Sequence, residues 1–271
     1  MSYYQGKRVL ITGAGTGLGA LLAEQLGRRG AEVIVTARRR KPAEEVCRRV
    51  QAAGGRGHAL LLDVSDLDSI PLFRDTVHER VGTVDVLINN AGVVHGGEFE
   101  RVPLSEHLDT LQINTLGLVA MSHAFLDDLR AAPQGHLVNI ASASAFIGLP
   151  WGSTYAASKW AVLGFSESLR LEMQERGLNN VSVTTVCPSY ISTGMFDGAR
   201  TPFLSPMLTP EKVVRAILKG VKQKRALVTE PALVRHLDLF KGALPGRIWD
   251  EVARRTGVST SMKHWQGKHP H

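Results

Sequence analysis

The sequence predicts an α/β protein with a doubly wound, parallel β-sheet and helices on both of its faces. Short apolar runs alternate along the chain with segments long enough to be crossover helices. The runs are continuously apolar, which is typical of strands buried on both faces of a parallel sheet. About seven strands are expected, at residues 8–12, 32–36, 58–62, 84–89, 135–140, 181–187 and 225–229. No linker or repeat divides the chain, so we expect a single domain over residues 1–271.

Composition argues against several other classes of protein. The net charge of +7 predicts a basic surface, but the arginines form short clusters without interleaved aromatic residues, so nucleic acid is not an expected partner. The two cysteines, Cys47 and Cys187, form no disulfide framework and no CxxC pair, so we expect a reducing compartment and no metal site. Without a signal segment or a run of about 18 apolar residues, a soluble, cytoplasmic protein with no integral membrane segment is expected.

A glycine-rich turn, TGAGTGLG at residues 12–19, follows the first strand and precedes a helical pattern that starts near Leu18. Glycine permits the turn and lets a diphosphate approach the backbone, and the helix N-terminus presents free N–H groups to it. The spacing fits both the GxGxxA fingerprint, through Gly15, Gly17 and Ala20, and the TGxxxGxG version. The turn residues expected to bind the cofactor are Gly13, Gly15, Thr16, Gly17, Leu18 and Gly19.

The end of the second strand selects between NAD and NADP. An acidic residue there would bond the ribose 2′-hydroxyl and repel a 2′-phosphate, whereas arginine accepts the phosphate. The sequence reads VIVTARRR, with Ala37 in the acidic position and Arg38, Arg39 and Arg40 after it. NADP, bound as NADPH through Arg38 and Arg39, is therefore the expected cofactor, and NAD is the alternative.

A tyrosine and a lysine further along the chain suggest acid–base chemistry. YAASK at residues 155–159 would bring Tyr155 and Lys159 to one face of a helix. Ser142 ends the preceding strand, and Asn114 lies in an earlier helical segment. In order and spacing, TGAGTGLG, NNAG (89–92), Asn114, Ser142, YAASK and Pro188 resemble the short-chain dehydrogenase/reductase family. The resemblance covers about residues 5–230 and implies a Rossmann-like, dinucleotide-binding fold.

The resemblance implies a role for each catalytic side chain. Tyr155 would be the general acid in carbonyl reduction and the base in alcohol oxidation, and Lys159 would favour its phenolate and bond the nicotinamide ribose. Ser142 would hold and polarise the substrate oxygen; Ser144 is a rival by chemistry, and the spacing to Tyr155 favours Ser142. Asn114 would anchor a water that connects Lys159 to solvent.

Further cofactor contacts are expected where strands end. Asp63 and Val64 are placed to line the adenine pocket, and the resemblance implies that Asn90, Ala91 and Gly92 shape the fourth strand's end against the adenine ribose. After the sixth strand the family often has Pro-Gly, and this chain departs from that pattern with Pro188-Ser189, which bears on backbone shape and not on chemistry. The contacts implied in this region are Pro188, Ser189, Ile191 and Thr193, the last on the nicotinamide carboxamide.

Residues 189–210 are rich in Gly, Pro, Ser and Thr, and we expect them to form a substrate loop, since loops this long in compact domains are usually functional. The expected pocket lining is mostly apolar or aromatic, which predicts a lipophilic alcohol or carbonyl substrate. The expected lining residues are Val94, His95, Phe146, Leu149, Trp151, Tyr190, Met195 and Phe196.

Two short segments, TGMFDG (193–198) and VSTSMKHWQGK (258–268), resemble the retinol dehydrogenase and 17-beta-hydroxysteroid dehydrogenase branch of the family. That branch often has an N-terminal membrane anchor, which we do not expect here, and an acidic residue where Ala37 stands. Residues 231–271 are expected to begin with a helix and end in a loosely ordered basic tail. The family commonly forms homodimers and homotetramers, which the resemblance implies here.

Other functions were weighed against an oxidoreductase. A non-catalytic dinucleotide sensor on the same fold is the main alternative, but Tyr155 and Lys159 are both present. A nucleotide-sugar epimerase or dehydratase needs a larger C-terminal domain than this sequence supplies. We therefore expect an NADP-dependent enzyme that interconverts a lipophilic alcohol, such as a retinoid or steroid, and its carbonyl compound.

Overall fold

The computed structural model describes residues 2–203 and 205–267, and within them seven parallel strands form one sheet. The order across the sheet is β3-β2-β1-β4-β5-β6-β7, so the chain winds outward first through β2 and β3 and then through β4 to β7. The predicted Rossmann-like doubly wound sheet is confirmed. The strands are β1 (Arg8–Ile11), β2 (Glu32–Ala37), β3 (Arg56–Leu61), β4 (Val86–Asn89), β5 (Gly135–Ile140), β6 (Val181–Pro188) and β7 (Leu227–Glu230).

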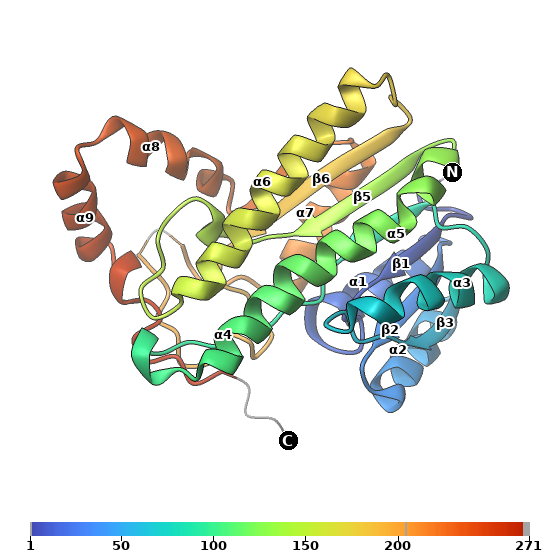
Figure 1. Cartoon of the computed structure of the whole chain (residues 1–271), viewed down its shortest axis with the longest axis horizontal. Helices are drawn as coiled ribbons and strands as arrows, with labels where there is room; N and C mark the ends of the chain where they lie inside the picture. The colour runs from blue at the N-terminus through green and yellow to red at the C-terminus, as the bar shows by residue number, and fades with distance from the viewer. Residues whose placement is uncertain (1, 204, 268–271) are drawn as a thin grey trace.

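Helices cover both faces of the sheet (Figure 1). Helices α1, α2 and α7 pack on one face, and α3, α5 and α6 pack on the other. No helix among the described residues is long and apolar enough to cross a membrane. The helices are α1 (Gly17–Gly27), α2 (Arg40–Ala52), α3 (Ile70–Arg80), α4 (Leu104–Leu111), α5 (Leu118–Ala131), α6 (Ser153–Glu175), α7 (Pro210–Lys222), α8 (Leu237–Ala243) and α9 (Gly246–Arg255).

The continuous apolar strands follow from this layering. In β1, Val9 and Ile11 pack under α1, α2 and α7, whereas Leu10 between them packs under the helices of the opposite face. Successive side chains of a strand point to opposite faces, so a strand covered on both sides needs an apolar residue at every position.

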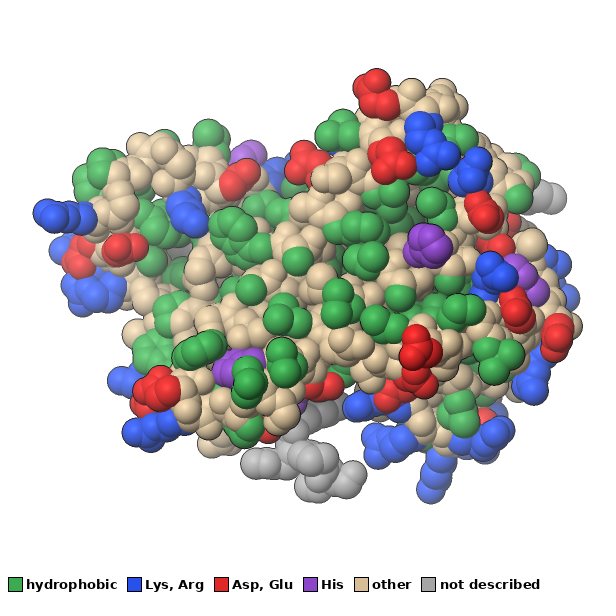
Figure 2. Space-filling view, in the orientation of Figure 1, with side chains coloured by type: hydrophobic (Ala, Val, Ile, Leu, Met, Phe, Trp, Pro, Cys, Tyr) green, Lys and Arg blue, Asp and Glu red, His purple; other side chains and the backbone are tan. Residues whose placement is uncertain are grey.

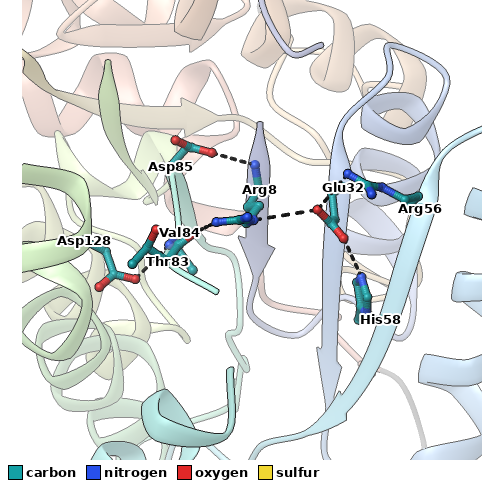
Figure 3. A network of polar contacts seen from close by, with 8 residues as sticks. All are labelled: Arg8, Glu32, Arg56, His58, Thr83, Val84, Asp85 and Asp128. Carbon is teal, nitrogen blue, oxygen red and sulfur yellow. Dashed lines mark hydrogen bonds and ion pairs between the residues drawn. The ribbon is translucent and has the colours of Figure 1, made fainter. Parts of the chain in front are cut away.

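Polar contacts tie the amino ends of the strands together (Figure 3). The Glu32 carboxylate at the start of β2 lies 3.0 Å from Arg56 Nη2 and 2.9 Å from His58 Nε2, both on β3. On its other side Glu32 lies 3.8 Å from Arg8 Nε on β1, and the Arg8 amide donates to Asp85 Oδ2 at 2.8 Å. These contacts occupy the amino edge of the sheet, which leaves the carboxyl edge for binding groups.

The chain after β7 differs from the expected helix and loose tail. Two short helices, α8 and α9, replace the single helix, because Pro245 between them cannot continue a helix. Residues 258–267 are not loose: their backbone and side chains pack against the loop at 189–203. The remaining tail residues, 268–271, lie outside the described residues.

Candidate active site

The glycine-rich turn between β1 and α1 is packed too closely for side chains. Gly13 has a φ of +63°, and a Cβ there would lie 2.8 Å from the Ala91 Cα atom. A Cβ on Gly19 would lie 2.5 Å from the Asn90 side-chain nitrogen. Glycine at these positions therefore lets the turn lie directly against the end of β4.

Asn90 holds that turn in place. Its Nδ2 donates to the carbonyl oxygens of Thr12, at 2.9 Å, and Gly13, at 3.1 Å. The Thr12 hydroxyl in turn accepts from the backbone amides of Asn90, at 2.9 Å, and Ala91, at 3.0 Å. The resemblance implied a contact with the adenine ribose for Asn90 and Ala91; the structure adds direct hydrogen bonds between the end of β4 and the glycine turn.

The N-terminus of α1 fits a diphosphate. Thr16 is the N-cap residue and its side chain makes no capping hydrogen bond, so the first amides of α1 are available to a ligand. The nearest atoms to a Cβ built on Gly17 belong to Thr193, at 3.6 Å. A cavity of about 460 Å³ is lined by Gly15, Thr16, Gly17 and Thr193 together with residues of α2 and α7. Leu18 packs its side chain on the core, which leaves its backbone amide at the helix N-terminus.

The end of β2 presents arginines and no acid. Ala37 is the last residue of β2, and Arg38 and Arg39 follow with exposed side chains. Neither arginine pairs with a carboxylate anywhere in the described residues, whereas Arg40 lies 3.6 Å from Glu44. Guanidinium groups in this setting suit a phosphate on the adenosine ribose.

Asp63 and Val64 follow β3 and stabilise the turn at its end through a hydrogen bond and a packing contact. The Asp63 carboxylate accepts from the Ser65 amide at 3.0 Å and from the Ser65 hydroxyl at 2.6 Å, which fixes the turn. Val64 is buried, and its carbonyl oxygen lies where a Cβ on Gly117 would stand. Asp63 also lines a cavity of about 510 Å³ with Arg38, so these two predicted cofactor residues share one hollow.

Three of the predicted catalytic side chains meet at the carboxyl ends of β5 and β6. Tyr155 and Lys159 lie on the first turns of α6, and Lys159 Nζ is 5.7 Å from the centre of the Tyr155 ring. Lys159 Nζ also donates to the Ile140 carbonyl at 2.9 Å. The Ser142 side chain hydrogen-bonds Tyr155, and all three side chains are buried.

Burial sets the protonation of this group. Burial raises the pKa of Tyr155, although the Ser142 hydrogen bond acts in the opposite direction. Burial lowers the pKa of Lys159 to about 8, and the nearby Cys187 opposes that change. At neutral pH the phenol therefore keeps its proton, and the site can offer two hydroxyl groups to one oxygen atom with an ammonium group behind them.

The structure separates Ser142 from its rival Ser144. Ser142 Oγ accepts from the Ser144 amide at 3.2 Å and bonds Tyr155. The Ser144 hydroxyl is buried and has no hydrogen-bond partner among the described residues. Only Ser142 is brought to the tyrosine.

Asn114 lies in a π-helical turn, Gln112–Gly117, between α4 and α5. Its Oδ1 accepts from the Val93 amide at 2.8 Å, and its Nδ2 donates to the Val93 carbonyl and the Ser158 hydroxyl, both at 3.0 Å. A Cβ on Gly92 would lie 3.2 Å from this Oδ1 and 3.6 Å from Lys159 Nζ. Since the side-chain amide is occupied, a water held by Asn114 would have to bind a backbone group of this π-turn, a feature frequent at functional sites.

The chain after β6 crosses the front of the cofactor cavity. β6 ends at Pro188. Ser189, which stands where the family often has glycine, donates its amide to the Glu230 carbonyl of β7 at 2.8 Å. Ile191 is buried under the segment that precedes α7. Thr193 lies opposite Gly17 and lines the same cavity as the glycine turn.

An apolar cluster, which we call the roof, covers Tyr155. The Phe196 ring lies edge-on to the Tyr155 ring with 5.9 Å between centroids, and Tyr190 lies 5.2 Å from Phe196 in the same manner. Most expected pocket residues belong to this cluster, which contains Val94, Leu149, Trp151, Tyr190, Met195, Phe196, Ala199, Met262 and Trp265 around Tyr155 and Ala156.

Two expected lining residues lie elsewhere, and two others were missed. Phe146 packs with Val162 and Cys187 in a separate cluster, and His95 lies between Glu106 and Asp109, 3.2 Å from each carboxylate. Met262 and Trp265 join the roof although they are distant in sequence. Their one sequence signal was the resemblance of VSTSMKHWQGK, which carried no location. Within residues 2–203 and 205–267, no group of three His, Cys, Asp or Glu residues could hold a metal ion.

Known proteins match this arrangement. The chain matches the family model for short chain dehydrogenases over residues 7–202. It is 37% identical to epidermal retinol dehydrogenase 2 of Mus musculus over 266 residues, covering 97% of this chain and 86% of the relative. The structure resembles an alcohol dehydrogenase from Thermococcus sibiricus complexed with 5-hydroxy-NADP, with a TM-score of 0.73 at 28% identity over 83% of this chain and 94% of that one.

A second solved structure matches the whole fold. A short-chain dehydrogenase/reductase from Burkholderia phymatum in complex with NAD has a TM-score of 0.80 at 22% identity, over 100% of this chain and 99% of that one. With the glycine turn, the buried tyrosine and lysine and the family match in agreement, the chain belongs to the short-chain dehydrogenase/reductase family of oxidoreductases.

Proposed function

We propose that this protein is an NADP-dependent oxidoreductase that reduces a lipophilic carbonyl compound, of the size of a retinoid or steroid, to its alcohol and can run in reverse. The observation that carries the proposal is the burial of Tyr155, hydrogen-bonded to Ser142, beneath a roof of apolar and aromatic side chains. Such a roof favours an apolar substrate body, and the two hydroxyl groups suit a single polar oxygen. The name of the mouse relative points to the same substrate class.

The residues divide the work as follows. A bound nicotinamide supplies the hydride, and the glycine turn, Thr193 and the end of β2 are the groups that would hold its dinucleotide. Ser142 donates a hydrogen bond to the substrate carbonyl and fixes its oxygen. Tyr155 gives its proton to that oxygen as negative charge develops there. The Lys159 ammonium stabilises the phenolate that remains.

Burial favours the reductive direction. The raised pKa of Tyr155 keeps the phenol protonated near neutral pH, so the residue is ready to act as an acid. Alcohol oxidation needs the phenolate instead, and the Lys159 charge is what would make it accessible. Acid catalysis of reduction is therefore expected near neutral pH, where the phenol is protonated and Lys159 still carries its charge.

NADP is the proposed cofactor because the end of β2 has Ala37 in place of an acid, followed by two arginines that pair with no carboxylate among the described residues. Titration of the protein with NADPH and NADH, followed by nicotinamide fluorescence, tests this choice. In Arg38→Ala with Arg39→Ala, the NADPH Kd should rise roughly 10- to 100-fold, as expected when charged hydrogen bonds are lost, while the NADH Kd stays unchanged.

Arg235→Ala with Arg247→Ala removes the same charge from exposed positions after β7 and serves as the matched control. Wild-type preference for NADH would contradict the phosphate argument and leave Tyr155 and Lys159 in place. Binding of neither nucleotide would instead favour a non-catalytic role on this fold.

We also propose a homodimer formed through the outer faces of α4 and α6 and the turn between α4 and α5. Figure 2 shows hydrophobic side chains gathered over this face of the molecule. Light scattering should show that Leu108→Glu with Leu116→Glu converts the dimer to a monomer. The control, Leu72→Glu on α3, should remain a dimer. A monomeric wild type would overturn the proposal. The exposed large apolar residues of these elements are Leu104, Leu108, Leu116, Trp160 and Leu171.

A further inference from the structure

The C-terminal segment 256–267 is hydrogen-bonded to the loop at 189–203 along much of its length. The Arg200 amide donates to the Ser261 carbonyl at 2.8 Å, and the Phe203 amide donates to the Thr256 carbonyl at 3.1 Å. In the opposite direction, the Gln266 amide donates to the Asp197 carbonyl at 2.9 Å. Each segment thus supplies hydrogen-bond partners for backbone groups of the other. If the segments separated, these groups would have to bond to water instead.

Side chains reinforce this pairing. The Tyr190 hydroxyl donates to Ser261 Oγ at 2.7 Å, and the Trp265 indole N–H donates to the Met195 carbonyl at 3.0 Å. The Trp265 ring also lies over Gly96, where a Cβ would be 2.9 Å from its Cε3 atom. The C-terminal segment is therefore attached to the loop after β6 and also reaches the loop after β4.

Two residues of the segment reach the catalytic tyrosine's cluster. Met262 is fully buried in it, and Trp265 packs at its edge. Tyr155 itself is only 4% exposed, so a substrate reaches its hydroxyl only when this cover is displaced. Because the cover is made from two hydrogen-bonded segments, opening either one alone would break the hydrogen bonds between them.

We propose that residues 256–267 are the second half of the lid over the substrate site, and that Met262 and Trp265 limit the size of the apolar group the site accepts. The inference deepens the proposed function and rests on it for the identity of the substrate. It assigns a place to the VSTSMKHWQGK segment, most of which lies in the described residues.

The specificity of the site tests the role of the two side chains. Reduction of straight-chain aldehydes from hexanal to tetradecanal with NADPH would be compared for wild type, Met262→Ala and Trp265→Ala. In the variants the preferred chain length should increase, and KM for short aldehydes should rise at least tenfold with a smaller change in kcat. Leu239→Ala, which removes an exposed side chain from α8, should match wild type. Unchanged preference in both variants would overturn the assignment.

Hydrogen exchange tests the lid without any substrate. Trp265→Ala should speed exchange of the Arg200, Phe203 and Gln266 amides together, by at least tenfold, and leave the amides of β5 unchanged. Faster exchange of Gln266 alone would show two independent segments and overturn the paired lid. If wild type reduces neither these aldehydes nor all-trans-retinal with NADPH, the proposed function fails while the exchange result still decides the lid.

Discussion

Lys159 lies behind Tyr155 on the same face of α6, with its Nζ 5.7 Å from the Tyr155 ring centre and 2.9 Å from the Ile140 carbonyl that it bonds. The carbonyl anchors the ammonium group, and the helix spacing places the phenol beside it. The buried lysine thus sets a positive charge beside the phenol that would give up its proton.

The ionisation of Lys159 should appear in the pH dependence of the enzyme. Its pKa is lowered to about 8, so kcat/KM for NADPH-dependent aldehyde reduction should fall as pH rises through about 8. Lys159→Met should remove this limb and lower the rate about 10²-fold or more, the scale of lost acid–base assistance. Lys159→Arg keeps its positive charge throughout, so its kcat/KM should stay constant to a higher pH than that of wild type. An unchanged alkaline limb in Lys159→Met would assign it to another group.

Substitution of Gly19 should disturb the cofactor turn specifically. A Cβ there would lie 2.5 Å from Asn90 Nδ2 and 2.8 Å from the Gly13 carbonyl, so Asn90 would lose the bonds that hold the turn. Gly19→Ala should weaken NADPH binding at least ~10-fold and destabilise the fold by about 1–3 kcal/mol, as overpacking does. The readouts are nicotinamide fluorescence and urea unfolding.

Gly164 provides the matched control for Gly19. It lies in α6, and nothing within 4 Å would meet a Cβ there. Gly164→Ala should therefore stabilise the protein by about 0.5–1 kcal/mol and leave NADPH binding unchanged. Equal effects of the two substitutions would show that the Gly19 result reflects the helix and not the turn.

His136 should make the protein sensitive to acid. Burial lowers its pKa to about 3, and the ring is fully enclosed on β5, with its Nε2 2.7 Å from the Thr184 hydroxyl. That hydroxyl donates to the Arg225 carbonyl, so Nε2 carries the hydrogen that bonds it, and the lowered pKa keeps the ring neutral at pH 7. Unfolded histidine binds a proton near pH 6.5, so the unfolded state takes up more protons between about 6.5 and 3, and stability falls as pH decreases through that range.

Urea unfolding at pH 7 and pH 5 measures this effect. His136→Gln should lose about 1–3 kcal/mol at pH 7, since buried hydrogen bonds are disrupted, but should lose less than wild type between the two pH values. His123→Gln, at an exposed position on α5, should retain the wild-type difference. The same pH dependence in all three proteins would place the acid sensitivity elsewhere.

Local signals predicted most of the scaffold. Strand positions followed from apolar runs because both faces of this sheet are covered, and the ends were less certain because they depend on distant partners. β4, for example, begins at Val86 and not at Val84, whose amide donates instead to the Asp128 carboxylate at 2.8 Å. The sequence likewise predicted one C-terminal helix where Pro245 separates two.

By itself the sequence determined the doubly wound fold, the family, the position of the glycine turn, and the pairing of Tyr155 with Lys159, because each depends on periodicity or on residues close together in the chain. The tertiary structure decided that Ser142 and not Ser144 contacts Tyr155 and that Asn90 holds the glycine turn. It also decided that the Asn114 side chain hydrogen-bonds the backbone of Val93. It also decided that Met262 and Trp265 cover the tyrosine. These contacts join residues far apart in sequence, and only the packed chain brings them within bonding distance.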